Sequence, residues 1–336
     1  MQTDKMINKK TTCCNRFGLL LLVMALLLAA IPALAACQPQ QQANKSIRLV
    51  RIGTLPIEDM LPFWVAEKQG LFNEMGLTVV IITYESSVEL AEALAGGYID
   101  MALTSPMTAV SLAARGIPLK LLWVALGTDS TQGRFGVLAN PERGIYKLAD
   151  LAGVPVAIGI DTLPEYAFDQ LMVAAGIPSE AIVYEVIQKP ELRYQLLASN
   201  QLAAAALPAS LLYQGQLDGM VLIADDSTGE NLSQSIMVAR LDYCESVADS
   251  MILAQLEQSW NSASVLVNTH PEACCQLLAE KTRLSDLAAV DYPISSYPLV
   301  TKPDGWMIDD IQAWMIEKGY LTFYLRYDSA SGVLSR

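Results

Sequence analysis

Short apolar runs alternate along the chain with longer amphipathic segments from about residue 47 onward. Apolar runs bounded by turn formers are typical of strands, and segments whose apolar positions recur at helical spacing are typical of helices. The predicted strands are 47–53, 78–83 (as a buried strand), 99–104, 119–126, 136–139, 155–158, 182–186, 202–207 and 221–224. The predicted helices are 61–74 with a break near residue 70, 86–96, 105–116, 164–175, 191–199, 209–214, 247–268, 271–281 and 303–318.

Capping residues mark several of these boundaries. Ser86-Ser87-Val88-Glu89 has the form of a capping box, and Gly96-Gly97 ends the same helix. Ser105-Pro106 supplies an N-cap and a proline at the first helical position of the next helix, which stops at Gly116. Strand–helix alternation of this kind predicts parallel α/β sheets with helices on both faces.

The length of the folded part indicates more than one lobe. About 290 residues follow residue 46, which is too many for one small core and sufficient for two lobes. The segments 91–112 and 195–215 share a plan of helix, polar break, alanine-rich strand, proline and helix, with Pro106 and Pro208 as matching prolines. Loose repeats of this kind arise in any α/β protein, but two lobes of similar construction are the simplest interpretation.

The amino-terminal segment has the pattern of a secretory signal. Four basic residues and one acid precede the uncharged apolar stretch 17–36, which ends in small residues directly before Cys37. A cysteine at this place resembles a bacterial lipoprotein signal, in which the peptide is cleaved before the cysteine and the cysteine is acylated. Stable anchoring would follow, because each buried CH₂ contributes about 0.8 kcal/mol. The alternative is a transmembrane anchor, since the apolar run is long enough to span a bilayer.

The residues after Cys37 support tethering. Segment 38–46 is polar and lacks hydrophobic periodicity, so that we expect residues 37–46 to act as a flexible tether. Loss of residues 1–36 leaves 18 Lys and Arg against 34 Asp and Glu, a net charge of −16. Such an acidic surface argues against nucleic acid as a partner. Cys244, Cys274 and Cys275 remain, and no cysteine or histidine spacing typical of a metal site is present.

Three stretches carry a resemblance to a known family: RIGTLPIEDMLPFWVAEKQGLFNEMGLTVVII, GGYIDMALTSPMTA and KLADLAGVPVAIG. They resemble the solute-binding subunits of ABC importers, and most of all the nitrate/sulfonate/taurine and thiamine-precursor group (SsuA/THI5-like, NMT1). The resemblance covers essentially the whole chain after the signal. It implies the type II periplasmic-binding-protein fold, with two α/β lobes, a two-crossover hinge and a ligand cleft between the lobes.

The resemblance also implies a domain organisation and partners. The chain would cross from lobe one near residues 127–136 and return near 225–235, where turn formers are abundant. The expected parts are a signal peptide (1–36), a tether (37–46), lobe one (47–130 plus 232–336) and lobe two (131–231). The expected partners are a small-molecule solute, the permease and ATPase subunits of an importer, and a membrane reached through the lipid. We expect a monomer on the extracytoplasmic side of the cell envelope, without a cofactor.

Candidate binding residues follow from the geometry of open α/β sheets, whose ligands lie outside the carboxyl ends of the strands near helix N-termini. The candidates are Thr54, Leu55, Glu58, Asp59, Trp64, Ser86, Ser87, Thr104, Ser105, Asp161, Thr162, Tyr166 and Pro208. Each Ser or Thr among them is also a natural helix cap, which is compatible with ligand contact by the same turn. Trp64 has two interpretations, as a core residue and as an aromatic platform.

The charges in these turns bear on the solute. Glu58, Asp59, Glu85, Asp161 and Glu165 are acids, and no Lys, Arg or His occupies the same turns. An anion would meet like charge in a closed cleft, which favours a neutral or cationic nitrogen-bearing solute, as in the thiamine-precursor branch. An anion stays open as an alternative, because Arg134 and Arg193 could reach the cleft from the hinge and from a lobe-two helix.

Catalysis is the weaker hypothesis. Some relatives in the thiamine-pyrimidine branch are enzymes that depend on histidine and iron. The only histidine here is His270, in a turn between carboxyl-terminal helices, and no glycine-rich phosphate loop is present. We therefore expect binding without turnover. A pyrimidine-precursor enzyme of the same fold and a lipoprotein adaptor that binds no solute remain as alternatives.

Overall fold

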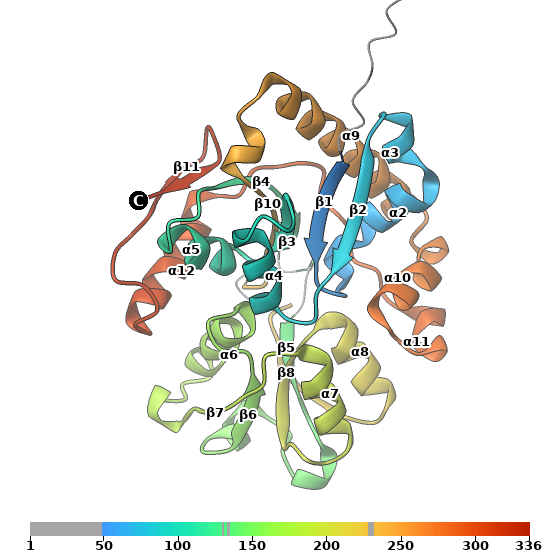
Figure 1. Ribbon diagram of the computed structural model, residues 1–336. Helices are drawn as coiled ribbons and strands as arrows, with labels where there is room; N and C mark the ends of the chain where they lie inside the picture. Colours follow the sequence, from blue (N-terminus) through green and yellow to red (C-terminus); the bar gives the residue numbers. More distant parts are fainter. Residues whose placement is uncertain (1–48, 130, 133–134, 228–231) are drawn as a thin grey trace, which may run out of the picture. The chain divides into compact units, whose positions relative to one another are not determined.

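The apolar segments form two β-sheets, each covered by helices on both faces (Figure 1). The computed structural model describes residues 49–129, 131–132, 135–227 and 232–336. The signal segment 1–36, Cys37, the tether and Arg134 lie outside these described residues. The two sheets confirm the prediction of a two-lobed α/β fold.

The first sheet has seven strands and is mixed rather than parallel. Its order is β11 (Arg326–Asp328), β12 (Val333–Ser335), β4 (Leu119–Leu126), β10 (Ser235–Arg240), β3 (Met101–Thr104), β1 (Leu49–Thr54) and β2 (Thr78–Thr83). β1 pairs in parallel with β2 and β3, whereas β10 is antiparallel to both β3 and β4, and β12 is antiparallel to β4. The prediction of a buried strand at 78–83 was wrong in one respect: β2 is the edge strand, and Val80 is exposed.

Helices pack on both faces of this sheet. One face is covered by α2 (Leu61–Gln69), α9 (Val247–Thr269) and α10 (Cys275–Thr282), and the other by α4 (Ser87–Ala95), α5 (Pro106–Ala114) and α12 (Gly305–Glu317). Alternation along the strands produces the two cores, since Met101 and Leu103 point to the first face and Ala102 to the second. The first core is centred on Phe63, whose ring meets those of Phe72 and Trp260 edge-on at 5.3 and 5.2 Å.

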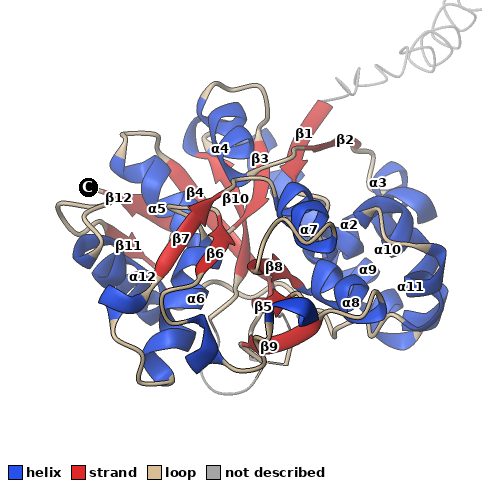
Figure 2. Cartoon of the chain, turned by 90° about the horizontal axis from the view of Figure 1, so that it is seen from below, coloured by secondary structure: helices blue, strands red, loops and turns tan. Residues whose placement is uncertain are grey.

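The second sheet has five strands. Its order is β7 (Val183–Val186), β6 (Pro155–Ile158), β8 (Ala204–Pro208), β5 (Phe135–Ala139) and β9 (Val221–Asp225). β6 is parallel to β7 and β8, and β5 is antiparallel to β8 and β9. Figure 2 shows α6 (Leu163–Ala174) on one side of this sheet, and α7 (Pro190–Ala198) and α8 (Ala209–Leu217) on the other.

The remaining elements are short. They are α3 (Leu71–Glu74), α11 (Asp286–Asp291) and the 3₁₀ turns η1 (Glu58–Met60), η2 (Pro141–Arg143), η3 (Leu148–Leu151), η4 (Ser179–Ala181), η5 (Leu241–Cys244) and η6 (Pro271–Ala273). The helix predicted at 271–281 is thus a 3₁₀ turn followed by α10. No helix in the described part of the chain combines the length and the apolar character that crossing a bilayer requires.

The chain passes between the sheets twice. β4 of the first sheet ends at Leu126 and β5 of the second begins at Phe135, while β9 ends at Asp225 and β10 of the first sheet begins at Ser235. The pattern analysis did not predict β10. It lies between β3 and β4, and its antiparallel direction follows from this return, because the strand re-enters the first sheet from the other sheet.

The turn before β3 in the first sheet and the turn before β8 in the second are each held by side-chain hydrogen bonds, but the residues that form these bonds differ. In the first, Asp100 accepts hydrogen bonds from the Arg51 backbone N–H at 2.9 Å and from its guanidinium at 2.6 Å. In the second, Asn200 has a left-handed backbone (φ 57°), and its side-chain oxygen accepts a bond from Arg143 Nε at 2.8 Å. An amide therefore ties the second turn where a carboxylate ties the first.

Candidate functional site

A cavity of about 70 Å³ lies where residues of both sheets meet. In the first sheet's half it is lined by the turn after β1, the N-termini of α4 and α5, and the start of β10. In the second sheet's half it is lined by the N-termini of α6, α7 and α8. Carboxyl ends of parallel strands and helix N-termini therefore converge here, as expected for a ligand site in an open α/β sheet.

Arg193 is the cation in the cavity wall. It lies on α7 and is 1 % exposed. Its Nε donates to the Ala206 carbonyl and its Nη1 to the Ile187 carbonyl, both at 2.8 Å. Its Nη2 has no hydrogen-bond partner among the described residues. Burial lowers the pKa of Arg193 to about 10, and the nearby Glu191 carboxylate partly opposes that change.

The opposite wall carries two carboxylates from η1, Glu58 and Asp59. The Tyr292 hydroxyl donates to Glu58 Oε2, and the Tyr297 hydroxyl donates to the Glu58 backbone carbonyl at 2.7 Å. Burial raises the pKa of Asp59, and the neighbouring Ser235 hydroxyl partly counteracts this effect. Within the described chain, Asp59 forms no ion pair with a Lys or Arg.

Two amide oxygens complete the polar lining. Gln188 Oε1 and Gln234 Oε1 are buried and have no hydrogen-bond partner in the described structure. Gln188 Nε2 donates to the Ile160 carbonyl at 3.4 Å, which orients the amide with its oxygen away from that contact. A buried polar atom without a partner costs about 1–3 kcal/mol, so these atoms and Arg193 Nη2 indicate groups that await a ligand or water.

The structure brings together eight of the predicted binding residues around the cavity: Leu55, Glu58, Asp59, Ser87, Thr104, Ser105, Thr162 and Pro208. Ser105 also caps α5, since its hydroxyl accepts a bond from the Thr108 N–H at 3.2 Å, as predicted for the capping role.

Five predicted residues do not line the cavity. Thr54 is buried at the end of β1, Trp64 is buried in the first core, and Ser86 caps α4 by accepting a bond from the Glu89 N–H at 3.2 Å. The Asp161 carboxylate accepts a bond from the Ser111 hydroxyl at 3.2 Å, and the Tyr166 hydroxyl donates to Asp310. Of the two interpretations of Trp64, the structure agrees with that of a core residue, since its side chain is buried in the first core and does not line the cavity.

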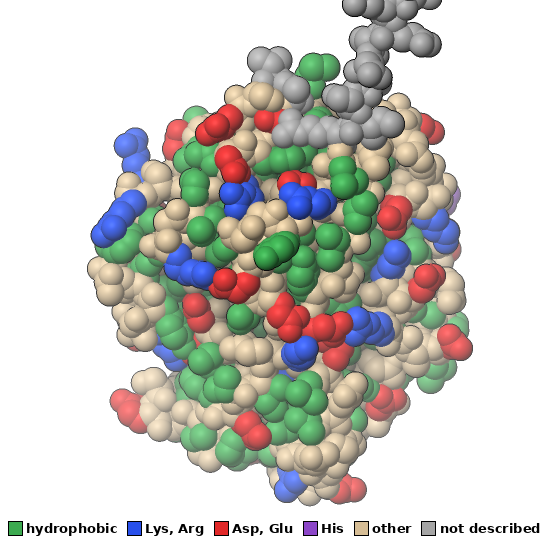
Figure 3. All heavy atoms as spheres, viewed as in Figure 1, with side chains coloured by type: hydrophobic (Ala, Val, Ile, Leu, Met, Phe, Trp, Pro, Cys, Tyr) green, Lys and Arg blue, Asp and Glu red, His purple; other side chains and the backbone are tan. Residues whose placement is uncertain are grey.

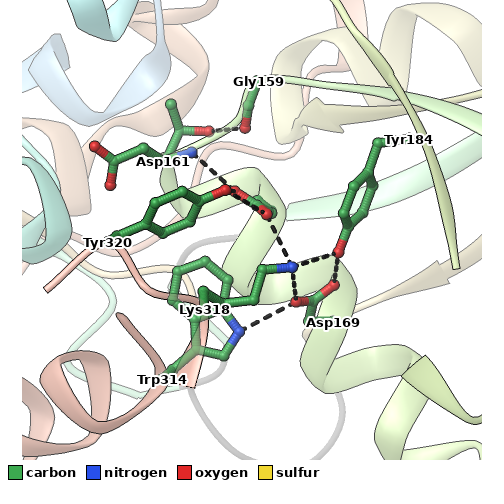
Figure 4. A network of polar contacts seen from close by, with 9 residues as sticks. Gly159, Asp161, Asp169, Tyr184, Trp314, Lys318 and Tyr320 are labelled. Atoms are coloured by element: carbon green, nitrogen blue, oxygen red, sulfur yellow. Dashed lines mark hydrogen bonds and ion pairs between the residues drawn. The ribbon is translucent and has the colours of Figure 1, made fainter. Parts of the chain in front are cut away.

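Glu165 and its neighbours form a separate polar network away from the cavity (Figure 4). Lys318, which follows α12, places its Nζ 3.0 Å from Glu165 and 3.2 Å from Asp169, both on α6. Tyr320 and Trp314 donate to the same two carboxylates, and Tyr184 contacts both Lys318 and Asp169. We call this set the Lys318 cluster: Lys318, Glu165, Asp169, Tyr184, Trp314 and Tyr320.

Several cavity residues were not predicted. They are Ile57, Leu90, Leu103, Phe135, Leu163, Pro164, Gln188, Pro190, Ala209, Ser233, Gln234 and Ser235, and Arg193 was named only as an alternative. The polar triplet at 233–235 was the available signal, because it ends the predicted return segment 225–235 and directly precedes an apolar run. Gln188 had no comparable signal, since it lies in the turn after an edge strand, β7.

Exposed ion pairs lie near the cavity. Lys189, directly before α7, is 3.3 Å from Glu89 on α4, and Arg283 is 2.6 Å from Glu85. The space-filling view likewise shows acidic and basic side chains close together near the middle of the face (Figure 3). The first of these pairs connects the two halves of the cavity wall across the surface.

The candidates for redox or metal chemistry lie elsewhere. Cys244, Cys274 and Cys275 are free thiols, and the last two are buried. His270 is exposed next to Glu272, in the turn between α9 and η6. Within the described residues, no cluster of three or more His, Cys, Asp or Glu side chains is arranged to hold a metal ion.

Comparison with solved structures shows the fold. The alkanesulfonate-binding protein SsuA from Xanthomonas axonopodis pv. citri, bound to MOPS, is similar with a TM-score of 0.70 and 19% identity, over 82% of this chain and 94% of that chain. The periplasmic aliphatic sulphonate-binding protein SsuA from Escherichia coli has a TM-score of 0.66 and 17% identity, over 82% and 89%. The periplasmic nitrate-binding protein NrtA from Synechocystis PCC 6803 has a TM-score of 0.66 and 14% identity, over 82% and 83%.

The family itself is identified at the level of sequence. A search of curated proteins finds no match. The family model described as NMT1/THI5 like matches residues 58–236, which is more than half of the chain and includes the turn that carries Glu58, the N-terminus of α5 and Arg193. The chain therefore belongs to the NMT1/THI5-like family.

Proposed function

We propose that this protein is an extracytoplasmic solute-binding lipoprotein, which captures a small molecule between its two lobes and delivers it to an ABC importer. The observation that carries the proposal is the cavity itself. It is enclosed by residues of both sheets, and its wall contains buried polar atoms without partners, Arg193 Nη2 foremost among them. Such a site gains stability when a ligand supplies the missing partners.

The comparisons support the proposal at the level of fold and family. Proteins described as sulfonate-binding and nitrate-binding share this architecture over more than four-fifths of the chain. The two passages of the chain between the sheets also support a hinge, and with it the division into lobe one (47–130 plus 232–336) and lobe two (131–231).

For the solute we propose a nitrogen-bearing molecule, neutral or cationic, as the carboxylates of Glu58 and Asp59 favour. Of the other acids in the turns, Glu165 is neutralised by Lys318 and Glu85 by Arg283, and Asp161 does not line the cavity. The acidic character of the site therefore depends on η1 alone. An anion of the sulfonate or nitrate kind is the second candidate, and the buried Arg193 guanidinium favours it.

The proposed activity is binding without chemical conversion. One structural neighbour is a mutant of the protein DSZB, which was solved in complex with biphenyl-2-sulfinic acid. Turnover of a bound pyrimidine by this protein would favour the enzyme alternative. Failure to bind any of the solutes tested would favour a lipoprotein adaptor. The single histidine, His270, lies outside the cavity lining.

A thermal-shift screen coupled to small-angle scattering tests the proposal. A ligand at 100 times its dissociation constant adds about 2.7 kcal/mol to the free energy of unfolding, which is readily detected as a higher melting temperature. The screen should contain amines, vitamins, pyrimidine precursors, amino acids, sulfonates and nitrate. A hit that also reduces the radius of gyration supports capture by lobe closure, whereas hits that leave the scattering unchanged contradict the hinge mechanism.

The anchoring part of the proposal has its own test. Cys37→Ala should release the protein from membranes or block its processing, because the acylated residue would be lost. Mass spectrometry of the wild-type protein should show an acylated amino terminus at Cys37. An uncleaved amino terminus would overturn the lipoprotein assignment and favour a transmembrane anchor.

A further inference from the structure

We propose that Tyr213 is a positioning residue, which transmits closure of the two lobes to the cavity wall through Tyr292 and Glu58. The inference rests on the proposed function, in which a solute is captured by lobe closure. It assigns a role in that capture to a side chain that does not itself line the cavity.

Tyr213 lies on α8, in the second sheet's half, and reaches across to the first. Its ring meets that of Tyr292 edge-on, with the ring centroids 5.1 Å apart and the planes at 75°. Its hydroxyl donates to the Asp291 backbone carbonyl at 3.0 Å, and the side-chain oxygen of the adjacent Gln214 accepts a bond from the Ser285 N–H at 3.0 Å. α8 therefore contacts both ends of the short helix α11, directly before Tyr292 (Figure 1).

The same helix forms part of the cavity wall. Pro208 and Ala209 line the cavity at the N-terminus of α8. Tyr213 follows Ala209 by four residues, which places both on one face of the helix, one turn apart. This part of the wall and the contact with Tyr292 therefore move together whenever α8 moves relative to the first sheet.

Tyr292 carries the contact onward to a cavity residue. It is buried, and its hydroxyl donates to the Glu58 carboxylate in η1. Tyr297 holds the same turn from a second direction, because its hydroxyl donates to the Glu58 backbone carbonyl at 2.7 Å. That carbonyl also accepts a bond from the Leu61 N–H at the start of α2. The direction of the Glu58 carboxylate in the wall therefore depends on where the Tyr292 ring lies.

The position of that ring depends on closure. Tyr213 packs against the first core although it belongs to the second sheet's half. Separation of the lobes would withdraw it, and Tyr292 would lose the ring that supports it from that side. The bond from Tyr292 to Glu58 lies within lobe one and would then be held less firmly. The Lys318 cluster also joins the two halves, but none of its residues lines the cavity.

Hydrogen exchange of the purified full chain, read at single residues by mass spectrometry, tests the coupling without a solute. The reporters are the N–H groups of Met60 and Leu61, which bond to backbone carbonyls of the same turn as Glu58. Tyr292→Phe removes the hydroxyl that holds Glu58. It should speed the exchange of both reporters roughly 10- to 100-fold, which is the range of one hydrogen bond to a charged group.

Tyr213→Leu should speed the same exchange roughly 3- to 10-fold, as expected for the loss of one aromatic pair. Tyr213→Phe keeps the ring and should leave the exchange unchanged. In the Tyr292→Phe background, Tyr213→Leu should have no further effect, because the bond through which it acts is already absent. The matched control is Tyr194→Leu on α7, since the Tyr194 hydroxyl donates to Asp218 within the second sheet's half. It should leave both reporters unchanged.

Four results would overturn the inference. The exchange of the reporters could be unchanged in Tyr213→Leu, or could rise equally in Tyr194→Leu, in which case the contact across the halves has no part in it. Equal acceleration in the central strand β3 would mean that Tyr213→Leu acts on the fold as a whole. Effects of Tyr213→Leu and Tyr292→Phe that add up would mean that Tyr213 does not act through Tyr292.

The experiment separates this inference from the proposed function because it uses no solute. Unchanged exchange, together with solutes that stabilise the protein in the thermal-shift screen, would overturn the inference and leave the proposed function standing. Exchange that responds as expected, while no compound in the screen stabilises the protein, would support the coupling between the halves and overturn solute capture.

Discussion

The cavity and the Lys318 cluster both bury charged side chains between elements of the two sheets, but they differ in how those charges are compensated. In the cluster, two carboxylates of α6 share one ammonium group and receive further bonds from Tyr320 and Trp314. In the cavity, a guanidinium and a carboxylate line the same space without an ion pair among the described residues. The first arrangement serves packing, and the second leaves interactions for a solute to complete.

The difference has a thermodynamic meaning. Removal of one partner from a buried, compensated pair leaves the other charge uncompensated and destabilises the fold. Removal of a buried charge that has no partner relieves a desolvation cost. Charge-removing substitutions should therefore change the free energy of unfolding with opposite signs in the two regions.

Lys318→Met should lower the free energy of unfolding by about 3–4 kcal/mol, because Glu165 and Asp169 would lose their cation while remaining buried. Urea denaturation followed by circular dichroism measures the change. The control is Lys281→Met, whose exposed partner Glu67 lies at 3.4 Å and which should cost less than about 1 kcal/mol. Ligand affinity of the folded Lys318→Met protein should stay unchanged, and a loss of binding without a loss of stability would contradict the comparison.

Asp226 provides a second test, since it is a buried carboxylate without an ion pair in the described chain. It follows β9, is 1 % exposed, and accepts a 2.6 Å bond from the Phe135 N–H at the start of β5. Burial raises the pKa of Asp226 to about 6, against the smaller opposing effects of Ser233 and backbone N–H groups. The folded state therefore holds the proton more tightly than the unfolded state, and stability should fall as pH rises from about 4 to about 6.

Asp226→Asn should remove that fall. The carboxamide can keep its oxygen on the Phe135 N–H while carrying no charge, so that the variant should exceed the wild type by about 2–3 kcal/mol above pH 6 and match it below pH 4. Urea denaturation at a series of pH values gives both curves. Parallel curves over the whole range would show that Asp226 does not titrate in this window.

The strands and the local turns could be predicted from sequence because both depend on neighbours along the chain. The apolar run at 119–126 and the Ser105-Pro106 cap are cases in which the observed element begins where the residues indicate. The strand β10 was missed although its apolar run is local, and its pairing with β3 and β4 could not be predicted because it joins segments more than 100 residues apart. The expected parallel sheets proved to be mixed for the same reason.

The site could be predicted only in part, for a related reason. Residues directly after β1 and β3 were found, because the rule that selects them is local. The acids were interpreted without their partners, since Lys318, Arg283 and Tyr292 come from carboxyl-terminal segments that packing brings to α6, Glu85 and Glu58. A count of acids in turns therefore overstated the negative charge that a solute would meet.

Asp59→Asn should raise the free energy of unfolding of the ligand-free protein by about 1 kcal/mol, because a desolvated carboxylate without a counter-ion is replaced by a neutral amide. The matched opposite is Glu165→Gln, which should destabilise because Lys318 would lose one of its two carboxylates. Chemical denaturation of both variants at pH 7 measures the contrast. The same sign of change in both would mean that the cavity and the Lys318 cluster do not differ as described.

The smallest effect is expected at the surface, where Lys189 pairs with Glu89 at 3.3 Å and joins the two halves of the cavity wall. Both side chains are more than 40% exposed (47% and 44%), so water screens the pair and holding it costs side-chain entropy. Lys189→Met should therefore change the free energy of unfolding by about 0.5 kcal/mol or less, and the difference should vanish at high salt. Denaturation at low and high ionic strength checks both statements. A salt-independent loss above about 1 kcal/mol would contradict this expectation, because it would show that the Lys189 side chain stabilises the protein by packing and not through a screened ion pair.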